Sequence, residues 1–152
     1  MRSTLKAVLL LGCLCVAGVR AESDGEFFNG KNTEGWEGLE FWKVSDGAIV
    51  GDTGKGINFN TFLCSKKEYG DFELSFQVRL KGGKGNSGVQ VRSRIHNKEK
   101  LAVTGPQCDI GAGYWGRLYG ENFGGMMKAS DAKKINAVLK SGDFNDYSIK
   151  CV

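Results

Sequence analysis

The chain has 152 residues, 21 of them Lys or Arg and 17 Asp or Glu. Residues 1–21 hold three of the cations (Arg2, Lys6 and Arg20) and no acid, so the rest of the chain is nearly balanced in charge. This balance argues against a nucleic-acid or membrane-surface partner, which selects strongly basic surfaces. The 23 Gly, the single Pro and the many short β-rich runs predict one all-β domain with tight turns.

Residues 1–21 have the pattern of a secretory signal peptide. Basic residues precede an apolar run over residues 7–19, which is too short to span a bilayer, and Val19-Arg20-Ala21 fits a cleavage site. The remaining domain, residues 22–152, is then secreted or periplasmic. An alternative is a lipid anchor at Cys13, because the residues before it loosely resemble a lipobox.

The elements expected next along the chain are strands. Residues 42–51 predict a β-hairpin, because two short apolar runs flank Asp46-Gly47, a strong turn signal. A short strand is expected over residues 62–64. The clearest strand covers residues 72–80, where apolar and polar side chains alternate, so one face is apolar and the other polar.

The second half predicts further strands and one helix. A Gly-rich turn over residues 82–88 leads into a strand over residues 89–95. Gly83 to Gly88 also match the GxGxxG pattern, but a dinucleotide site needs a helix after the last Gly, and a strand pattern follows here. A helix capped by Ser130 is expected over residues 131–140, and a strand starts at Tyr147.

The cysteines point to a structural role rather than to metal binding. Cys64, Cys108 and Cys151 follow the signal, which allows at most one internal disulfide. Cys108 and Cys151 are interpreted as small buried residues on apolar strand faces. Because the chain has no CxxC motif and only one histidine, His96, we do not expect a zinc site.

The most informative stretch runs from Asn86 to Glu121 and carries an unusual polar strand face. Alternation gives this face Gln90, Arg92 and Arg94 from one segment and Gln107 and Asp109 from the next, followed by Tyr114 and Trp115. Amides, charged groups and planar aromatics suit a sugar, and Glu73 joins them if its strand lies in the same sheet. The alternative is an ordinary solvated sheet face. Trp36 and Trp42 are expected in the core.

The sequence closely resembles the 3-keto-disaccharide hydrolase family over nearly all of residues 22–152. The resemblance rests on Phe28-Asn29-Gly30-Lys31, Trp42-Lys43-Val44, Tyr69-Gly70-Asp71-Phe72, the run Asn86 to Ser93 and the run Gln107 to Tyr119. It implies a concanavalin A-like jelly-roll β-sandwich. It also implies an enzyme that removes the C2 proton of 3-keto-glycosides, eliminates the group at C1 and hydrates the product.

Residue chemistry then assigns roles for that reaction. Asp109 or Glu73 is the candidate base, Arg92 the candidate enolate stabiliser and Tyr114 the candidate acid. Gln90, Gln107 and Trp115 are the candidate substrate-binding residues. The identity of any cofactor is left open: a divalent metal is an alternative to Arg92, although no ligand motif identifies its site.

Two alternatives to an active enzyme remain at this stage. One is a non-catalytic carbohydrate-binding module, which needs hydrogen-bonding groups and an aromatic ring but no base. The other is an inactive fragment, because members of the family continue beyond the strand at Tyr147 and the chain is therefore expected to be truncated at its C-terminus. The combination of Glu73, Arg92 and Asp109 favours the enzyme.

Overall fold

The computed structural model describes residues 27–152. The predicted signal peptide and the alternative lipid anchor at Cys13 lie outside the described residues. Among the described residues, no helix is long and apolar enough to cross a membrane. The strands are β1 (Trp36–Glu37), β2 (Trp42–Ser45), β3 (Ala48–Gly51), β4 (Cys64–Ser65), β5 (Phe72–Val78), β6 (Asn86–Gln90), β7 (Arg94–Asn97), β8 (Ala102–Gly111), β9 (Leu118–Glu121), β10 (Gly125–Lys128) and β11 (Asn145–Cys151).

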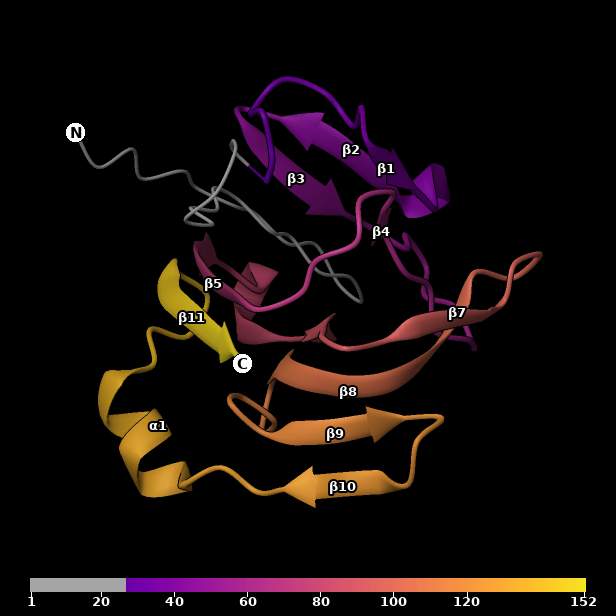
Figure 1. Cartoon of the computed structure of the whole chain (residues 1–152). Helices are drawn as coiled ribbons and strands as arrows, with labels where there is room; N and C mark the ends of the chain where they lie inside the picture. The colour runs from indigo at the N-terminus through magenta and orange to yellow at the C-terminus, as the bar shows by residue number, and fades with distance from the viewer. Residues whose placement is uncertain (1–26) are drawn as a thin grey trace.

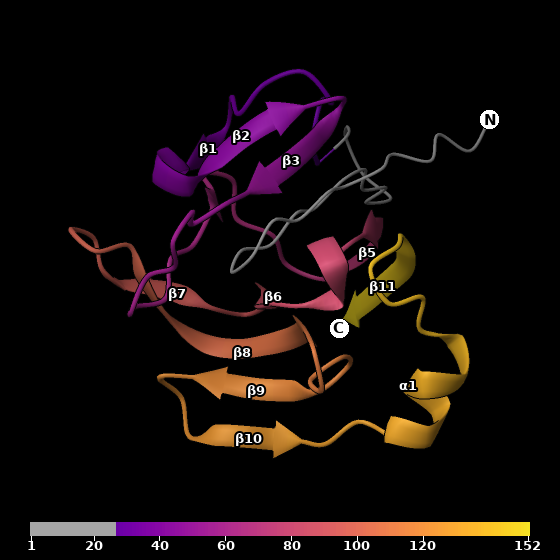
Figure 2. The ribbon, with the colours of Figure 1, turned by 180° about the vertical axis from the view of Figure 1, so that it is seen from behind.

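Antiparallel pairing organises these strands into sheets, which confirms the all-β class. The largest sheet has the order β10-β9-β8-β6, with β7 also paired to β8. The other pairs are β1 with β4, β2 with β3, and β5 with β11. Figures 1 and 2 show the hairpin β2–β3 at one end of the molecule and β8, β9 and β10 at the other, with β5 and β11 along one side. This arrangement is that of a β-sandwich, and the jelly-roll strand order stays a prediction.

One hydrophobic core joins strands from both ends of the molecule. Val50 of β3, Phe76 of β5, Val89 of β6, Ile110 of β8 and Ile149 of β11 are all buried in the same cluster. A second, smaller cluster contains Phe28, Trp36, Trp42 and Ile49, which confirms that both tryptophans are core residues. The alternating pattern over residues 72–80 is also confirmed, because Leu74, Phe76, Val78 and Leu80 are buried.

Local signals explain several elements. Asp46 and Gly47 have φ values of 51° and 74°, the left-handed conformation that a tight hairpin turn requires, and they join β2 to β3 as predicted. The helix α1 (Ala132–Val138) begins one residue later than expected. Its N-cap is Asp131 rather than Ser130, because the Asp131 carboxylate accepts bonds from the backbone N–H groups of Lys133 and Lys134.

Two strand predictions need correction. The expected strand over residues 62–64 is displaced to β4, where Cys64 and Ser65 pair with β1. The expected strand over residues 89–95 is interrupted between β6 and β7 by an irregular segment in which Arg92 has a φ of 48°. The GxGxxG stretch leads into β6 and not into a helix, in agreement with the sequence analysis. The 3-10 turn η2 (Lys81–Gly83) ends at the first glycine of this stretch, and another such turn, η1 (Leu39–Phe41), precedes β2.

Candidate functional site

A cavity of about 930 Å³ lies against one face of the largest sheet. This volume is in the range of sites that hold small molecules. Strands β6, β8 and β9 supply its polar wall, and the segment over residues 59–63 together with Lys66 and Lys67 supplies much of the opposite wall. The polar side chains on the sheet side are Gln90, Gln107, Asp109, Arg117, Tyr119 and Glu121.

Strand register brings Gln90, Gln107 and Asp109 onto the same face. Gln90 lies opposite Gln107, and Gly88 lies opposite Asp109. The Gln90 Nε2 donates to Gln107 Oε1 at 2.9 Å, and the Gln107 Nε2 donates to Asp109 Oδ1 at 2.9 Å. The neighbouring residue Cys108 packs against the hydrophobic core instead. The alternation predicted from the sequence is therefore confirmed for these three residues. Asp109 is only 6% exposed, which argues against an ordinary solvated face at that position.

The Asp109 carboxylate has an environment suited to proton transfer. Burial raises its pKa above the ordinary value for aspartate, and the nearby Glu121 acts in the same direction. The hydrogen bond from Gln107 and the positive charge of Arg117 oppose this rise. A carboxylate that lines a cavity and has a pKa raised by burial is a typical candidate for a general base.

Tyr114 and Trp115 are adjacent in the connection between β8 and β9, but their side chains lie in different environments. Tyr114 is exposed and lines the cavity, whereas Trp115 is 8% exposed and belongs to the core, where its ring lies 6.3 Å from that of Tyr147. Trp115 does not line the cavity, so the structure does not place it as a stacking platform for a sugar. The chain then turns back, and the Asp109 N–H donates to the Arg117 carbonyl at 2.9 Å.

Arg117 is a cavity residue that the sequence analysis missed. Its guanidinium carbon lies 4.9 Å from the centre of the Tyr114 ring, and its charge acts on Asp109. The cluster of glycines over residues 111–116 was the available signal. A tight turn there sends the chain back beside β8 and places residue 117 next to residue 109.

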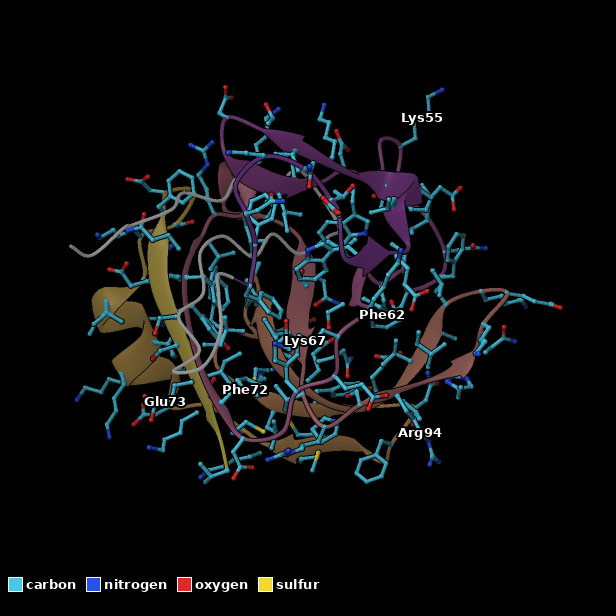
Figure 3. All side chains as sticks on the ribbon, turned by 45° about the horizontal axis from the view of Figure 1, so that its top comes forward. Lys55, Phe62, Lys67, Phe72, Glu73 and Arg94 are labelled. Carbon is cyan, nitrogen blue, oxygen red and sulfur yellow. The ribbon has the colours of Figure 1, made fainter. Side chains whose placement is uncertain are left out.

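The structure does not bring Glu73 and Arg92 into the hydrogen-bonded group. Glu73 is exposed on β5 and forms an ion pair with Lys150, and Figure 3 shows it beside β11, apart from Phe62 and Arg94. Arg92 lines the cavity, but its guanidinium donates to the Gly70 carbonyl at 2.8 Å and pairs with Asp71. Arg94 also contributes to the lining and is exposed.

The opposite wall is tied to the sheet. The Asn60 Nδ2 donates to Glu121 Oε1 at 2.9 Å, which joins the segment after β3 to β9. Phe59, beside Asn60, is 56% exposed, and its ring lies 6.4 Å from that of Phe41. Lys67 and Phe62, labelled in Figure 3, also line this wall. The cavity therefore combines a polar sheet face with a partly aromatic wall.

The cysteines of the described segment are free thiols. Cys64, Cys108 and Cys151 form no disulfide with one another, and burial raises the pKa of both the Cys64 and the Cys108 thiol to about 11. Both thiols are therefore neutral and unreactive at neutral pH. Across residues 27–152, no group of three His, Cys, Asp or Glu side chains is arranged to hold a metal ion.

A substitution at Gly88 is expected to disturb the site through its contact with Gln107. A Cβ atom there would lie 2.4 Å from the Gln107 Cγ, so Gln107 must leave its position beside Asp109. We expect Gly88→Ala to cost about 1–3 kcal/mol of stability through overpacking and to break the hydrogen bond between Gln107 and Asp109. Chemical denaturation and the NMR signals of the Gln107 side-chain amide measure both effects. Gly70→Ala is the control, because a Cβ atom at Gly70 has open space; equal effects of the two substitutions would contradict the prediction.

Comparison with known proteins identifies the family of the chain. A search among curated proteins finds no significant match. The model of one protein family, described as the 3-keto-alpha-glucoside-1,2-lyase-like domain, matches residues 24–152. This match covers the whole cavity and nearly all of the chain outside the predicted signal peptide. The chain therefore belongs to the family of 3-keto-alpha-glucoside-1,2-lyase-like domains.

Proposed function

We propose that this protein is a lyase and hydratase of glycosides that carry a ketone at C3 of the sugar. The observation that carries this proposal is the buried Asp109 carboxylate, which lies on the wall of a sugar-sized cavity beside Arg117. Membership of the family supplies the class of substrate. The signal peptide predicted over residues 1–21 leads us to expect that the reaction takes place outside the cytoplasm.

Asp109 acts as the general base in this proposal. The ketone at C3 acidifies the proton on C2, and Asp109 takes that proton as the electrons of the C2–H bond move toward the C3 oxygen. Gln107 occupies Oδ1 of Asp109, which leaves Oδ2 for the substrate. A raised pKa suits this role, because a base accepts protons best when its pKa approaches the working pH.

The enolate must be stabilised until the glycosidic bond breaks. Arg117 is the nearest candidate, because its charge acts on Asp109 and its guanidinium forms no ion pair within residues 27–152. Arg92 is already bonded to Gly70 and Asp71. When the enolate collapses, the C1–O bond breaks, and in this proposal Tyr114, which lines the cavity with its ring against Arg117, protonates the departing oxygen. Elimination releases the aglycone and leaves a double bond between C1 and C2.

Hydration completes the sequence. The water gives one proton to the Tyr114 phenolate as its oxygen adds to C1, and the proton on Asp109 returns to C2. The free 3-keto sugar forms, and both Asp109 and Tyr114 are restored to their starting forms. The second N–H of the Gln107 amide is available for a sugar hydroxyl, since the first donates to Asp109. Carbohydrate is therefore the partner that we propose for this cavity.

The proposal is tested by release of 4-nitrophenol from the 3-keto form of 4-nitrophenyl glucoside, compared with the unoxidised glucoside. We expect turnover of the oxidised substrate alone, because only the ketone acidifies C2. Reactions without protein correct for spontaneous elimination. Equal turnover of both substrates would contradict the mechanism. Binding of both without turnover would indicate the carbohydrate-binding module instead.

A further inference from the structure

The irregular segment between β6 and β7 is a one-residue bulge that redirects a side chain into the site. Gln90 pairs with Gln107 and Arg94 pairs with Thr104, so the three residues 91–93 oppose only the two residues 105 and 106. Arg92, with a φ of 48°, takes the left-handed conformation in the bulge. The extra residue reverses the alternation of side chains. Ser93 therefore shares a face with Gln90, although regular alternation would place it on the opposite face.

The close packing around Ser93 agrees with this register. A Cβ atom at Gly105 would lie 2.3 Å from the Ser93 Oγ, so only glycine leaves room for the serine across the strand pair. The Ser93 Oγ donates to the Gln90 Oε1 at 2.8 Å. Two backbone carbonyls also lie near the hydroxyl, that of Val91 at 2.9 Å and that of Pro106 at 3.3 Å. The contact with Gln90 is the shortest of the three.

Ser93 thereby closes a hydrogen-bond chain that has one direction. An ionised Asp109 only accepts hydrogen bonds, so Gln107 must present its N–H to Asp109 and its carbonyl to Gln90. Gln90 must then present its N–H to Gln107 and its carbonyl to the next residue. That residue has to be a donor, and the hydroxyl of Ser93 supplies the proton. Without it, the Gln90 carbonyl would be partly buried without a donor.

We propose that Ser93 is a positioning residue for the base Asp109. It fixes the orientation of both amides, so that a Gln107 N–H always points to Oδ1 and Oδ2 stays open to the substrate. The inference rests on the proposed function, in which Asp109 removes the C2 proton. The other ionisable groups that act on Asp109 are Arg117, just before β9, and Glu121 of β9, while the Tyr147 hydroxyl of β11 donates to the Asp109 backbone carbonyl.

A matched pair of substitutions isolates the hydroxyl. Ser93→Thr keeps the donor, and Ser93→Val has the same shape without it. Both add the same bulk beside Gly105, so any cost of packing is shared. We expect Ser93→Val to lower kcat about tenfold, the effect of one hydrogen bond to a positioned group, with a smaller change in KM, because Ser93 acts on Asp109 through the two amides. Ser93→Thr is expected to stay near the unsubstituted protein.

The decisive readout is the titration of Asp109, followed by NMR of its carboxyl carbon in the intact protein without substrate. We expect its pKa to rise in Ser93→Val and to return in Ser93→Thr, because the amide chain favours the ionised form. The acid limb of kcat against pH should move in the same direction. Ser75→Val, on the exposed face of β5, is the surface control.

An unchanged Asp109 titration in a folded Ser93→Val protein would overturn the positioning role. If the β-branched pair does not fold, Ser93→Ala is titrated against Gln90→Met, which breaks the chain at its middle; both should raise the pKa of Asp109, and no rise in either overturns the proposal. The titration needs no turnover. A protein inactive on 3-keto-glycosides with a normal Ser93 effect would thus refute the proposed reaction and leave the hydrogen-bond chain established.

Discussion

Replacing Asp109 with asparagine is expected to lower kcat on a 3-keto-glucoside by about a thousandfold, within the usual contribution of a general base. Asparagine has nearly the same shape, and its Oδ1 can still accept the N–H of Gln107, so the hydrogen-bond chain persists. It cannot accept the C2 proton. Steady-state release of 4-nitrophenol measures the loss. Activity close to that of the unsubstituted protein would remove Asp109 from the mechanism.

The same substitution has an expected effect on stability with a definite sign. Burial raises the pKa of Asp109 in the folded protein, so its ionised form lowers stability at neutral pH. The cost fades as the pH falls through the folded pKa and the carboxyl becomes neutral. We therefore expect Asp109→Asn to melt at or above the temperature of the unsubstituted protein at pH 7, with a difference that shrinks in acid.

Glu73→Gln is the matched control for the base. Glu73 is exposed and paired with Lys150 on the edge formed by β5 and β11, and it does not line the cavity. An exposed ion pair contributes little to stability. We expect this variant to keep its activity and its melting temperature. A thousandfold loss here, with Asp109→Asn active, would exchange the roles of the two carboxylates.

The second large effect is expected at Trp115, whose neighbour Tyr114 serves as its control. Trp115→Ala should lower stability by about 3–5 kcal/mol, the usual cost of removing a buried aromatic ring. That loss is serious for a domain whose total stability is about 5–15 kcal/mol. Trp115 is 8% exposed and packs in the core beside Tyr147, while Tyr114 is 43% exposed on the cavity wall.

Tyr114→Ala should cost about 1 kcal/mol or less, the value of its contact with Arg117. Its main expected effect is slower elimination, with the largest loss for substrates whose leaving group needs a proton. Urea denaturation measures both stabilities. A stable Trp115→Ala protein that has lost only sugar binding would show that the tryptophan, not the tyrosine, faces the substrate.

Side-chain alternation made part of the site predictable. Gln90, Gln107 and Asp109 share a face because β6 and β8 pair without irregularity between residues 86 and 90. The hairpin at Asp46-Gly47 was predictable for a similarly local reason, since few residues adopt two successive left-handed conformations. In both cases the information lies within a few residues of the feature itself.

The rest depends on which strands meet, which alternation does not specify. Glu73 lies on the exposed face of β5, whereas its neighbours Phe72 and Leu74 line the cavity, and β5 pairs with β11 rather than with the polar strands of the cavity. To predict Arg117 in the site, one must know that the chain turns back after β8. To predict Ser93 there, one must know of the bulge at Arg92, which moves the Ser93 side chain to the face of Gln90. Trp115 follows Tyr114 directly, so a tight connection decided which of the two rings faced the cavity.

The central claim is that Asp109 removes the C2 proton of a 3-keto-glycoside, and an isotope experiment tests it most directly. A 3-keto-glucoside with deuterium at C2 is compared with the protonated substrate, with the unsubstituted protein and with Asp109→Asn. Our account predicts a primary isotope effect on kcat/KM and exchange of the C2 position with solvent, both lost in Asp109→Asn. Aglycone release that is equally fast for both isotopes, with no exchange at C2 and no dependence on Asp109, would contradict the account.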